Sequence, residues 1–274
     1  MWGQPQSREQ LVKRPLIHLL GGKKIGWRSP ISPILTYHLI TPEPTRYIYS
    51  ASCRQFERHL AWLAALSAGT VIPDTPIPEV TFDDGRTSDH AFALAILEKY
   101  RIRATFFVTC GLVESEPGFM SWNQVRQLAS LGHAVQSHGW SHLLLTRANE
   151  AQLTHELEWS KKELEDRVGL PVTSLSLPGG RWSAKVLEAC VKVGYERVYH
   201  SNPFQTFEPP LGMRFIGRLM VRNSMSVQCL QALVEGGNSV VVYYRAQHVL
   251  REAAKQMMGD QTYHHLWRTL VRIP

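Results

Sequence analysis

The feature that most constrains the fold of this chain is a regular alternation of short apolar runs with longer segments of helical periodicity. Strand-like runs lie at 34–38, 79–82, 104–108, 133–138 and 173–177, with later ones near Tyr195, near Phe215 and over 239–244. Helical spacing fills the intervals, over 53–66, 88–100, 121–131, 153–164 and a segment through Leu187 that Gly194 ends. This order predicts an α/β fold built on a parallel sheet, with 239–244 as the last strand.

The size of the chain is consistent with one enzyme domain. Its 274 residues, 44% of them hydrophobic, can bury a sizeable core. The four cysteines form no C-x-x-C pair and are predicted to be ordinary thiols. We expect three parts: an N-terminal basic extension over 1–32, a barrel over 33–245, and basic amphipathic helices over 246–274 that pack on the barrel.

Two adjacent carboxylates follow the apolar run 79–82. Successive side chains of a strand point to opposite faces, so Asp83 and Asp84 are expected to diverge at the strand end, where Gly85 favours a turn. Such a pair suits a division of labour in which one aspartate binds a cation and the other remains a base. Taken alone, the segment favours a solvated turn.

A pair of histidines with the spacing H-x-x-x-H follows the run 133–138. Gly139 favours a loop rather than a helix for His138 to His142. Two imidazoles and one carboxylate form the donor set of open, catalytic divalent-metal sites. A histidine pair alone is more often surface decoration, but together with the Asp83-Asp84 turn it favours a metal site.

These residues resemble the polysaccharide deacetylases, carbohydrate esterase family 4, of the exopolysaccharide or surface-glycan type. The first motif of that family is Thr-Phe-Asp-Asp-Gly, which matches 81–85, and the second is His-(Ser/Thr)-x-x-His, which is similar to 138–142. The resemblance extends over about 33–200 and includes the runs 34–38, 104–108 and 175–180. It implies the irregular (β/α)7 barrel of the family, in which the carboxyl ends of the strands meet on one face.

The resemblance also implies an activity, the removal of an N-acetyl group by hydrolysis. In that scheme Asp84, His138 and His142 bind a divalent ion, most commonly zinc, and Asp83 is the general base. The backbone N–H of Gly179, in the segment similar to the third motif, is expected to stabilise the oxyanion.

The sequence departs from the family pattern at two places. Ser176 stands where the third motif commonly carries an arginine that orients the base, and Arg181 is either its replacement or a surface residue. The histidine expected on the last strand is missing from 239–244, which leaves the general acid open. His38, at the end of the first strand, is the preferred candidate, ahead of His248 and then His200.

The net charge of +7 is compatible with an acidic glycan, a nucleotide-linked sugar or an anionic membrane surface. Basic amphipathic segments at 13–28 and 245–272 predict peripheral membrane contact or simple packing on the barrel. No export signal, membrane span or nucleic-acid motif is recognised, so we expect a cytoplasmic protein, placed at the inner membrane surface if these segments bind lipid. The expected substrate is an N-acetylhexosamine unit of a polysaccharide or surface-glycan precursor, either lipid-linked or nucleotide-linked. The alternative is a catalytically impaired, glycan-binding pseudoenzyme of the same fold.

Overall fold

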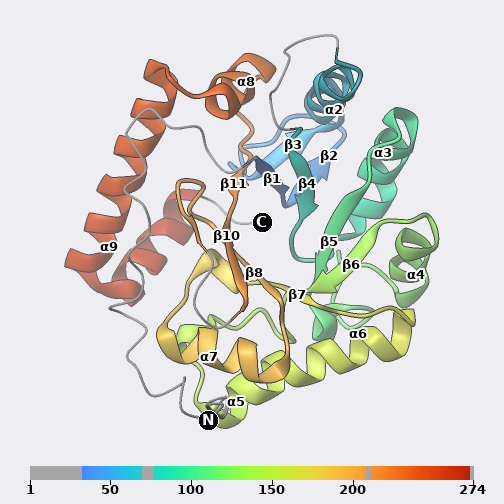
Figure 1. Ribbon diagram of the computed structural model, residues 1–274, viewed down its shortest axis with the longest axis vertical. Coiled ribbons are helices and arrows are strands. Elements are labelled where there is room, and N and C mark those ends of the chain that lie inside the picture. The colour runs from blue at the N-terminus through green and yellow to red at the C-terminus, as the bar shows by residue number, and fades with distance from the viewer. Residues whose placement is uncertain (1–32, 70–76, 208–211, 272–274) are drawn as a thin grey trace, which may run out of the picture.

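The structure is a computed structural model that describes residues 33–69, 77–207 and 212–271. A nine-stranded sheet forms its centre, in the order β11-β1-β4-β5-β6-β7-β8-β10-β9 (Figure 1). Its strands are β1 (Ile34–Tyr37), β4 (Glu79–Phe82), β5 (Ala104–Val108), β6 (Ala134–Ser137), β7 (Ser174–Ser176), β8 (Arg197–His200), β9 (Thr206–Phe207), β10 (Arg214–Gly217) and β11 (Leu219–Met220). All pairs are parallel except β9 with β10.

The two ends of this sheet meet. The short strands β10 and β11 are separated only by Arg218, yet β10 pairs with β8 whereas β11 pairs with β1. This segment therefore joins the last parallel strand to the first, and the sheet becomes a barrel of the predicted (β/α)7 type. A small sheet of β2 (Leu39–Thr41) and β3 (Ser50–Ser52) lies beside it.

Helices surround the barrel, as the sequence periodicity predicts (Figure 1). They are α2 (Cys53–Ser67), α3 (Leu94–Tyr100), α4 (Trp122–Ser130), α5 (Glu150–Thr154), α6 (Ser160–Val168), α7 (Ala184–Val193), α8 (Val227–Glu235) and α9 (Ser239–Val271). Ser121 begins α4 with a capping box, and Gly194 ends α7 in the left-handed conformation, both as expected.

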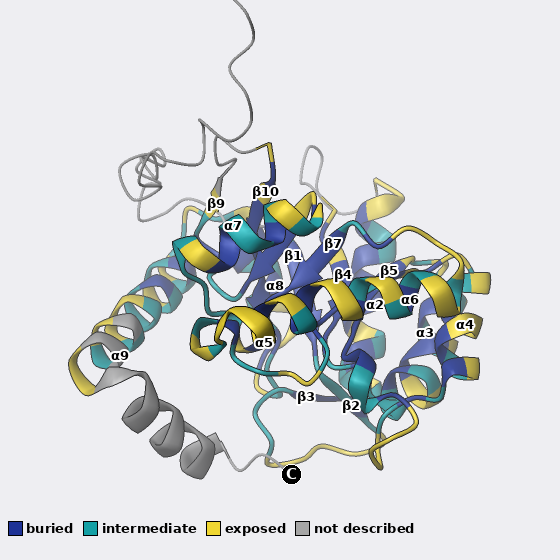
Figure 2. Ribbon diagram, turned by 90° about the horizontal axis from the view of Figure 1, so that it is seen from below, coloured by how far each residue is buried: buried dark blue, intermediate teal, exposed yellow. Residues whose placement is uncertain are grey.

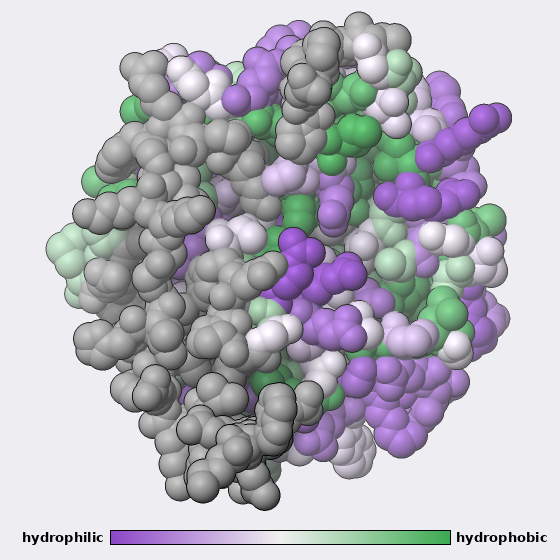
Figure 3. Space-filling view, viewed as in Figure 1, coloured by the Kyte–Doolittle hydropathy of each residue, from purple (hydrophilic) through white to green (hydrophobic). Residues whose placement is uncertain are grey.

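The core lies between the sheet and the helices. Figure 2 shows buried strands surrounded by helices that expose one side. Phe82 and Phe106 stack in neighbouring strands at 4.8 Å between ring centroids. The outer side of α6, which carries Lys162 and Asp166, contributes to a hydrophilic surface (Figure 3). All four cysteines are free thiols.

The C-terminal region differs from the prediction. Residues 239–244, expected to form the last strand, are the beginning of the helix α9, and the strand that closes the barrel is the β10–β11 segment. The five apolar residues 240–244 that follow Ser239 fit a buried strand and a helix equally well, and in this structure they are helical. The boundary expected at 245/246 consequently falls inside α9, while the extension 1–32 lies outside the described residues. Within the described ranges, no helix has both the length and the apolar character needed to cross a bilayer.

Candidate active site

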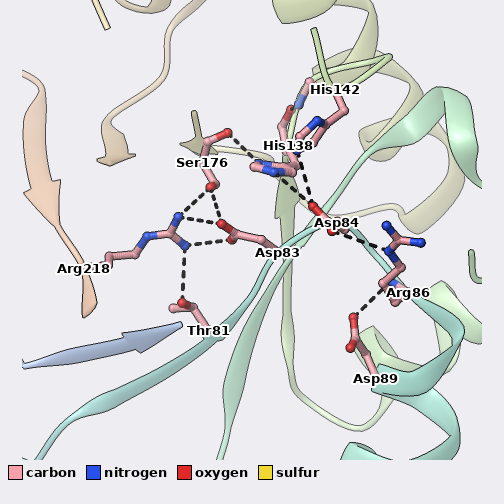
Figure 4. Close-up of polar contacts among 11 residues, drawn as sticks. Thr81, Asp83, Asp84, Arg86, Asp89, His138, His142, Ser176 and Arg218 are labelled. Carbon is pink, nitrogen blue, oxygen red and sulfur yellow. Dashed lines mark hydrogen bonds and ion pairs between the residues drawn. The ribbon is translucent and has the colours of Figure 1, made fainter. Parts of the chain in front are cut away.

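The turn after β4 separates the two aspartates. The Asp83 N–H donates to the carbonyl of Tyr37 at 3.0 Å, which continues the pairing of β4 with β1. Asp84 and Gly85 then adopt φ values of 80° and 82°. A left-handed conformation is costly for an aspartate, and such strain occurs mainly at functional sites. The turn directs the carboxylates of Asp83 and Asp84 to different partners (Figure 4).

Asp83 is buried and held by an arginine from the β10–β11 segment that closes the barrel. Arg218 donates from both terminal nitrogens to the two carboxylate oxygens at 2.8 Å, and Ser176 donates its hydroxyl at 3.1 Å (Figure 4). Burial alone would raise the pKa of Asp83, but the charges of Arg218 and His138 outweigh it and lower the pKa to about 2. The carboxylate is therefore ionised at neutral pH.

Asp84 faces two histidines instead. Its Oδ1 lies 3.5 Å from Nε2 of His138 and 3.5 Å from Nε2 of His142, and its Oδ2 lies 3.5 Å from Nε of Arg86. Burial raises the pKa of Asp84, but the hydrogen bond from His138 and the charge of His142 lower it further than burial raises it. The structure thus brings together the predicted metal ligands.

This donor set fits a divalent ion. The three donor atoms lie within 4.8 Å of one another. Donors placed about 2.1 Å from a tetrahedral ion are about 3.4 Å apart, close to the two separations at Asp84. Nδ1 of His138 lies 2.8 Å from the carbonyl of Ser176, which makes Nδ1 the protonated nitrogen and leaves Nε2 as the donor towards the ion.

A buried glutamate holds the loop between the histidines. Glu156, which is 3% exposed, accepts hydrogen bonds from the backbone N–H groups of Trp140 and Ser141 at 2.7 and 3.0 Å and from the Ser141 hydroxyl. The loop ends at His142, whose φ of 61° is again left-handed. Glu156 therefore fixes a strained segment in the geometry that presents both ligands. The sequence analysis did not single out this residue.

Arg218 is the second residue that sequence reasoning missed. It lies between β10 and β11, is 1% exposed, and donates from Nη2 to the Ser176 hydroxyl at 2.7 Å. Arg181 lines the same cavity, and the guanidinium that meets Asp83 is that of Arg218, so Arg218 holds the place at the base for which Arg181 was one of the two interpretations. The signal available in the sequence was an arginine inside an apolar run, because a charge in a strand core requires a partner.

His38 lies beside the base and the metal ligands. It follows β1, lines the cavity and stacks on Tyr49 at 5.3 Å between ring centroids. Its buried Nδ1 has no hydrogen-bond partner among the described residues. Burial lowers the pKa of His38, and the carboxylates of Asp83 and Asp84 oppose that effect only in part. A neutral imidazole with an unengaged nitrogen therefore borders the reaction site.

The other two candidates for the acid differ from each other. His248 lies on α9, lines the cavity and contacts the ring of Phe204 at 6.1 Å between centroids. His200 has both ring nitrogens engaged, at 3.1 Å from the carbonyl of Gln205 and 3.2 Å from the N–H of Asn202. Burial lowers the pKa of His200 to about 3, and His200 is not among the described residues that line the cavity, so both observations favour a structural role.

The cavity that connects these residues has a volume of about 530 Å³. Gly179 lines it with a φ of 64°, and a Cβ atom there would lie 2.7 Å from Leu144. A side chain at this position would require both strain and a clash, so glycine keeps the backbone close to the cavity.

The chain is similar in sequence to known polysaccharide deacetylases. The family model described as polysaccharide deacetylase matches residues 73–198. YxkH of Bacillus subtilis, assigned to the polysaccharide deacetylases, is 28% identical over 216 residues, which cover 74% of this chain and 76% of YxkH. The peptidoglycan-N-acetylglucosamine deacetylase PgdA of Listeria monocytogenes is 29% identical over 130 residues, 45% of this chain and 27% of PgdA.

Solved structures agree on the fold. The Streptococcus pyogenes deacetylase PplD, in complex with acetate, matches with a TM-score of 0.62 and 22% identity over 75% of this chain and 99% of PplD. IcaB from Ammonifex degensii matches with a TM-score of 0.63 and 22% identity over 76% of this chain and 98% of IcaB. These matches confirm the predicted barrel.

Proposed function

This chain belongs to the polysaccharide deacetylase family and is a carbohydrate N-deacetylase, and we propose that it hydrolyses the N-acetyl group of an N-acetylhexosamine unit in a surface-glycan precursor. The observation that carries this proposal is the pair of adjacent aspartates with different partners. Asp84 faces His138 and His142, whereas Asp83 is held outside that set by Arg218.

The residues around the cavity can perform the hydrolysis. Asp83 takes a proton from the water molecule whose oxygen attacks the acetyl carbon. The N–H of Gly179 donates to the oxyanion that forms on the carbonyl oxygen. When the C–N bond breaks, the proton that Asp83 took from the water passes through His38 to the departing sugar amine, and acetate is released; His248 is the second candidate for this transfer.

The cofactor is a divalent metal ion held by Asp84, His138 and His142, and we propose zinc. Two imidazoles with one carboxylate suit zinc, and a bound ion would polarise the acetamide carbonyl and acidify the attacking water.

An acetate-release assay with metal-loaded protein tests this function. N-acetylated sugars in lipid-linked, nucleotide-linked and polymeric form are supplied, and we expect acetate from at least one precursor form. His138→Ala and His142→Ala should lose both the ion, measured by elemental analysis, and the acetate signal. Unchanged metal content in both variants would contradict the ligand assignment, and activity only on long, finished polymer would contradict the precursor.

We also propose that the protein works at the cytoplasmic surface of the membrane, where a precursor would be held. On α9 the side chains of Tyr243, Leu250 and Met257 are 59%, 70% and 81% exposed. They recur every seven residues, about two helical turns, and so lie along one side of the helix. This apolar stripe supports interfacial binding better than Arg245, which is buried against Phe204 at 4.4 Å. The basic segment 13–28 lies outside the described residues.

Vesicle sedimentation tests this location. Binding to anionic vesicles is expected at low salt, to weaken at high salt, and to fall with Leu250→Asp or Met257→Asp. Leu170→Asp, at an exposed apolar residue after α6, is the matched control. Absence of binding at low salt would contradict the membrane proposal without affecting the assigned chemistry.

A further inference from the structure

The catalytic cavity is asymmetric in charge. Its lining carboxylates among the described residues are Asp83 and Asp84, both at the metal end. Arg218 pairs with Asp83 and Arg86 lies next to Asp84. The lining continues from these pairs to Arg222 and Arg251.

Arg222 occupies the rim at the carboxyl end of the closing strand, two residues after β11. It is half-buried, and within the described part of the chain its buried Nε has no hydrogen-bond partner. Its guanidinium lies 6.0 Å from the ring centroid of Tyr244. Burial and the positive charge of Arg251 both lower the pKa of Arg222, with only tyrosines acting in the other direction. Arg222 and Arg251 thus both line this end of the cavity, and no ion pair joins Arg222 to a carboxylate of the described residues.

Aromatic side chains connect this end of the cavity to the reaction site. Tyr49 stacks on His38, and Tyr47 meets Tyr49 edge to face at 5.9 Å between ring centroids. Both tyrosines line the cavity. A sugar ring can rest its apolar face on such side chains while polar groups at either end fix its orientation.

We propose that Arg222 and Arg251 form an anion subsite that binds the phosphate or diphosphate of a phosphorylated N-acetylhexosamine while its acetamido group reaches Asp83. The inference rests on the proposed function and names its substrate class. A guanidinium presents a planar fork of N–H donors that pairs bidentately with phosphate oxygens, and Arg222 has no carboxylate partner among the described residues to compete for its fork. The cavity volume of about 530 Å³ lies within the usual range for small-molecule sites. The sequence analysis placed the basic character in the segments 13–28 and 245–272, whereas this subsite is local and shares the cavity of the metal ligands.

The test compares charged and neutral substrates on the full-length, zinc-loaded protein. Methyl N-acetylglucosaminide is the neutral substrate. N-acetylglucosamine 1-phosphate, a nucleoside-diphosphate N-acetylglucosamine and a short-chain polyprenyl-diphosphate N-acetylglucosamine carry the anion, and the last two distinguish a nucleotide from a lipid source. The variants are Arg222→Gln and Arg251→Gln, with Arg126→Gln on the exposed side of α4 as the matched control. The backbone carbonyl of Arg222, which accepts from Gln55 and Met225, is unaffected by its substitution.

We expect Arg222→Gln and Arg251→Gln to raise KM for the phosphorylated substrates by about 10- to 100-fold, the loss of a charge-assisted hydrogen bond. Values of kcat, and KM for the methyl glycoside, should stay close to those of wild type. Equal effects on neutral and phosphorylated substrates, or no effect on either, would overturn the subsite.

A binding measurement distinguishes failure of the proposed deacetylase function from failure of the anion subsite. Glucose 1-phosphate has no acetyl group, and calorimetry measures its affinity whether or not the protein turns anything over. Wild type and Arg126→Gln should bind it, and Arg222→Gln should lose about tenfold or more in affinity. If no sugar releases acetate but this difference persists, the proposed function fails and the subsite stands. If acetate is released but the difference is absent, only the subsite fails.

Discussion

Two regions of the barrel form the site in different ways. One is the half from β4 to β6, which carries the motifs, and the other is the segment β10–β11, which closes the barrel. Between β4 and β6, the base and the metal ligands follow strand ends in two short motifs, with supporting residues nearby in sequence. The closing segment β10–β11 has no motif and contributes one side chain, Arg218, which meets Asp83 across 135 positions of sequence. The difference shows that local sequence specifies which groups do the chemistry, whereas barrel closure specifies the charge that surrounds them.

The largest effect expected separates the two aspartates within the motif half. Asp83→Asn should keep the metal, because Asp83 lies outside the ligand set, yet lose about a thousandfold or more in turnover because the general base is removed. Asp84→Asn should lose both metal and turnover. Metal analysis together with acetate release makes the comparison. High residual activity in Asp83→Asn would place the base elsewhere.

The second effect concerns the general acid, for which the candidates are His38, directly after β1, and His248 on α9. His38→Ala should slow deacetylation of N-acetyl sugars by about a hundredfold or more but have much less effect on an activated acetyl ester, whose leaving group needs no proton. His248→Ala should have little effect on either substrate. Equal losses on both substrates would make His38 a positioning residue, and a loss confined to His248→Ala would assign the acid to α9.

The contrast between the two regions explains what the sequence could predict. The strands up to β8, their helices, and the positions of Asp83, Asp84, His138 and His142 follow from periodicity, turn residues and two local motifs. Arg218 did not follow, because the apolar run 239–244 satisfies the strand pattern as well as Phe215 and its neighbours do. Once the last strand was placed too late, the arginine belonging to it could not be paired with Asp83. Glu156 was missed because it accepts mainly from backbone N–H groups, which leave no trace in the sequence, and its one side-chain donor, Ser141, belongs to no recognised pattern.

Arg218 provides the third test, because it joins the two regions. Arg218→Met leaves Asp83 buried without its partner, and loss of one member of a buried pair costs roughly 3–5 kcal/mol in the free energy of unfolding. Denaturant unfolding measures this loss, and acetate release should fall as the base loses its orientation. The double variant Arg218→Ser with Ser176→Arg moves the guanidinium to β7, where the Ser176 hydroxyl lies 2.7 Å from Nη2 of Arg218. Partial recovery of both properties is expected, and a fully stable, active Arg218→Met would remove Arg218 from the site.

The smallest effect concerns two buried histidines at which the closing region meets the rest of the barrel. His59 bonds to the Tyr37 hydroxyl at 2.9 Å and to the carbonyl of Met225 at 3.1 Å, and His200 stacks on Phe215 at 4.1 Å between ring centroids. Burial lowers the pKa of His59 from 6.5 to about 4 and that of His200 to about 3. Below about pH 6.5 the unfolded chain binds protons that the native protein does not, so stability present above this pH is lost as the pH falls towards 4. Each histidine should contribute a loss of roughly 2 kcal/mol between pH 6.5 and 5.

This loss is measured as the free energy of unfolding of wild type and of the double variant His59→Gln/His200→Gln across this pH range. The double variant should be less stable than wild type at pH 7.5, but its stability should depend less on pH. Parallel curves would mean that other groups cause the acid sensitivity, and that these two histidines stabilise the junction only through packing.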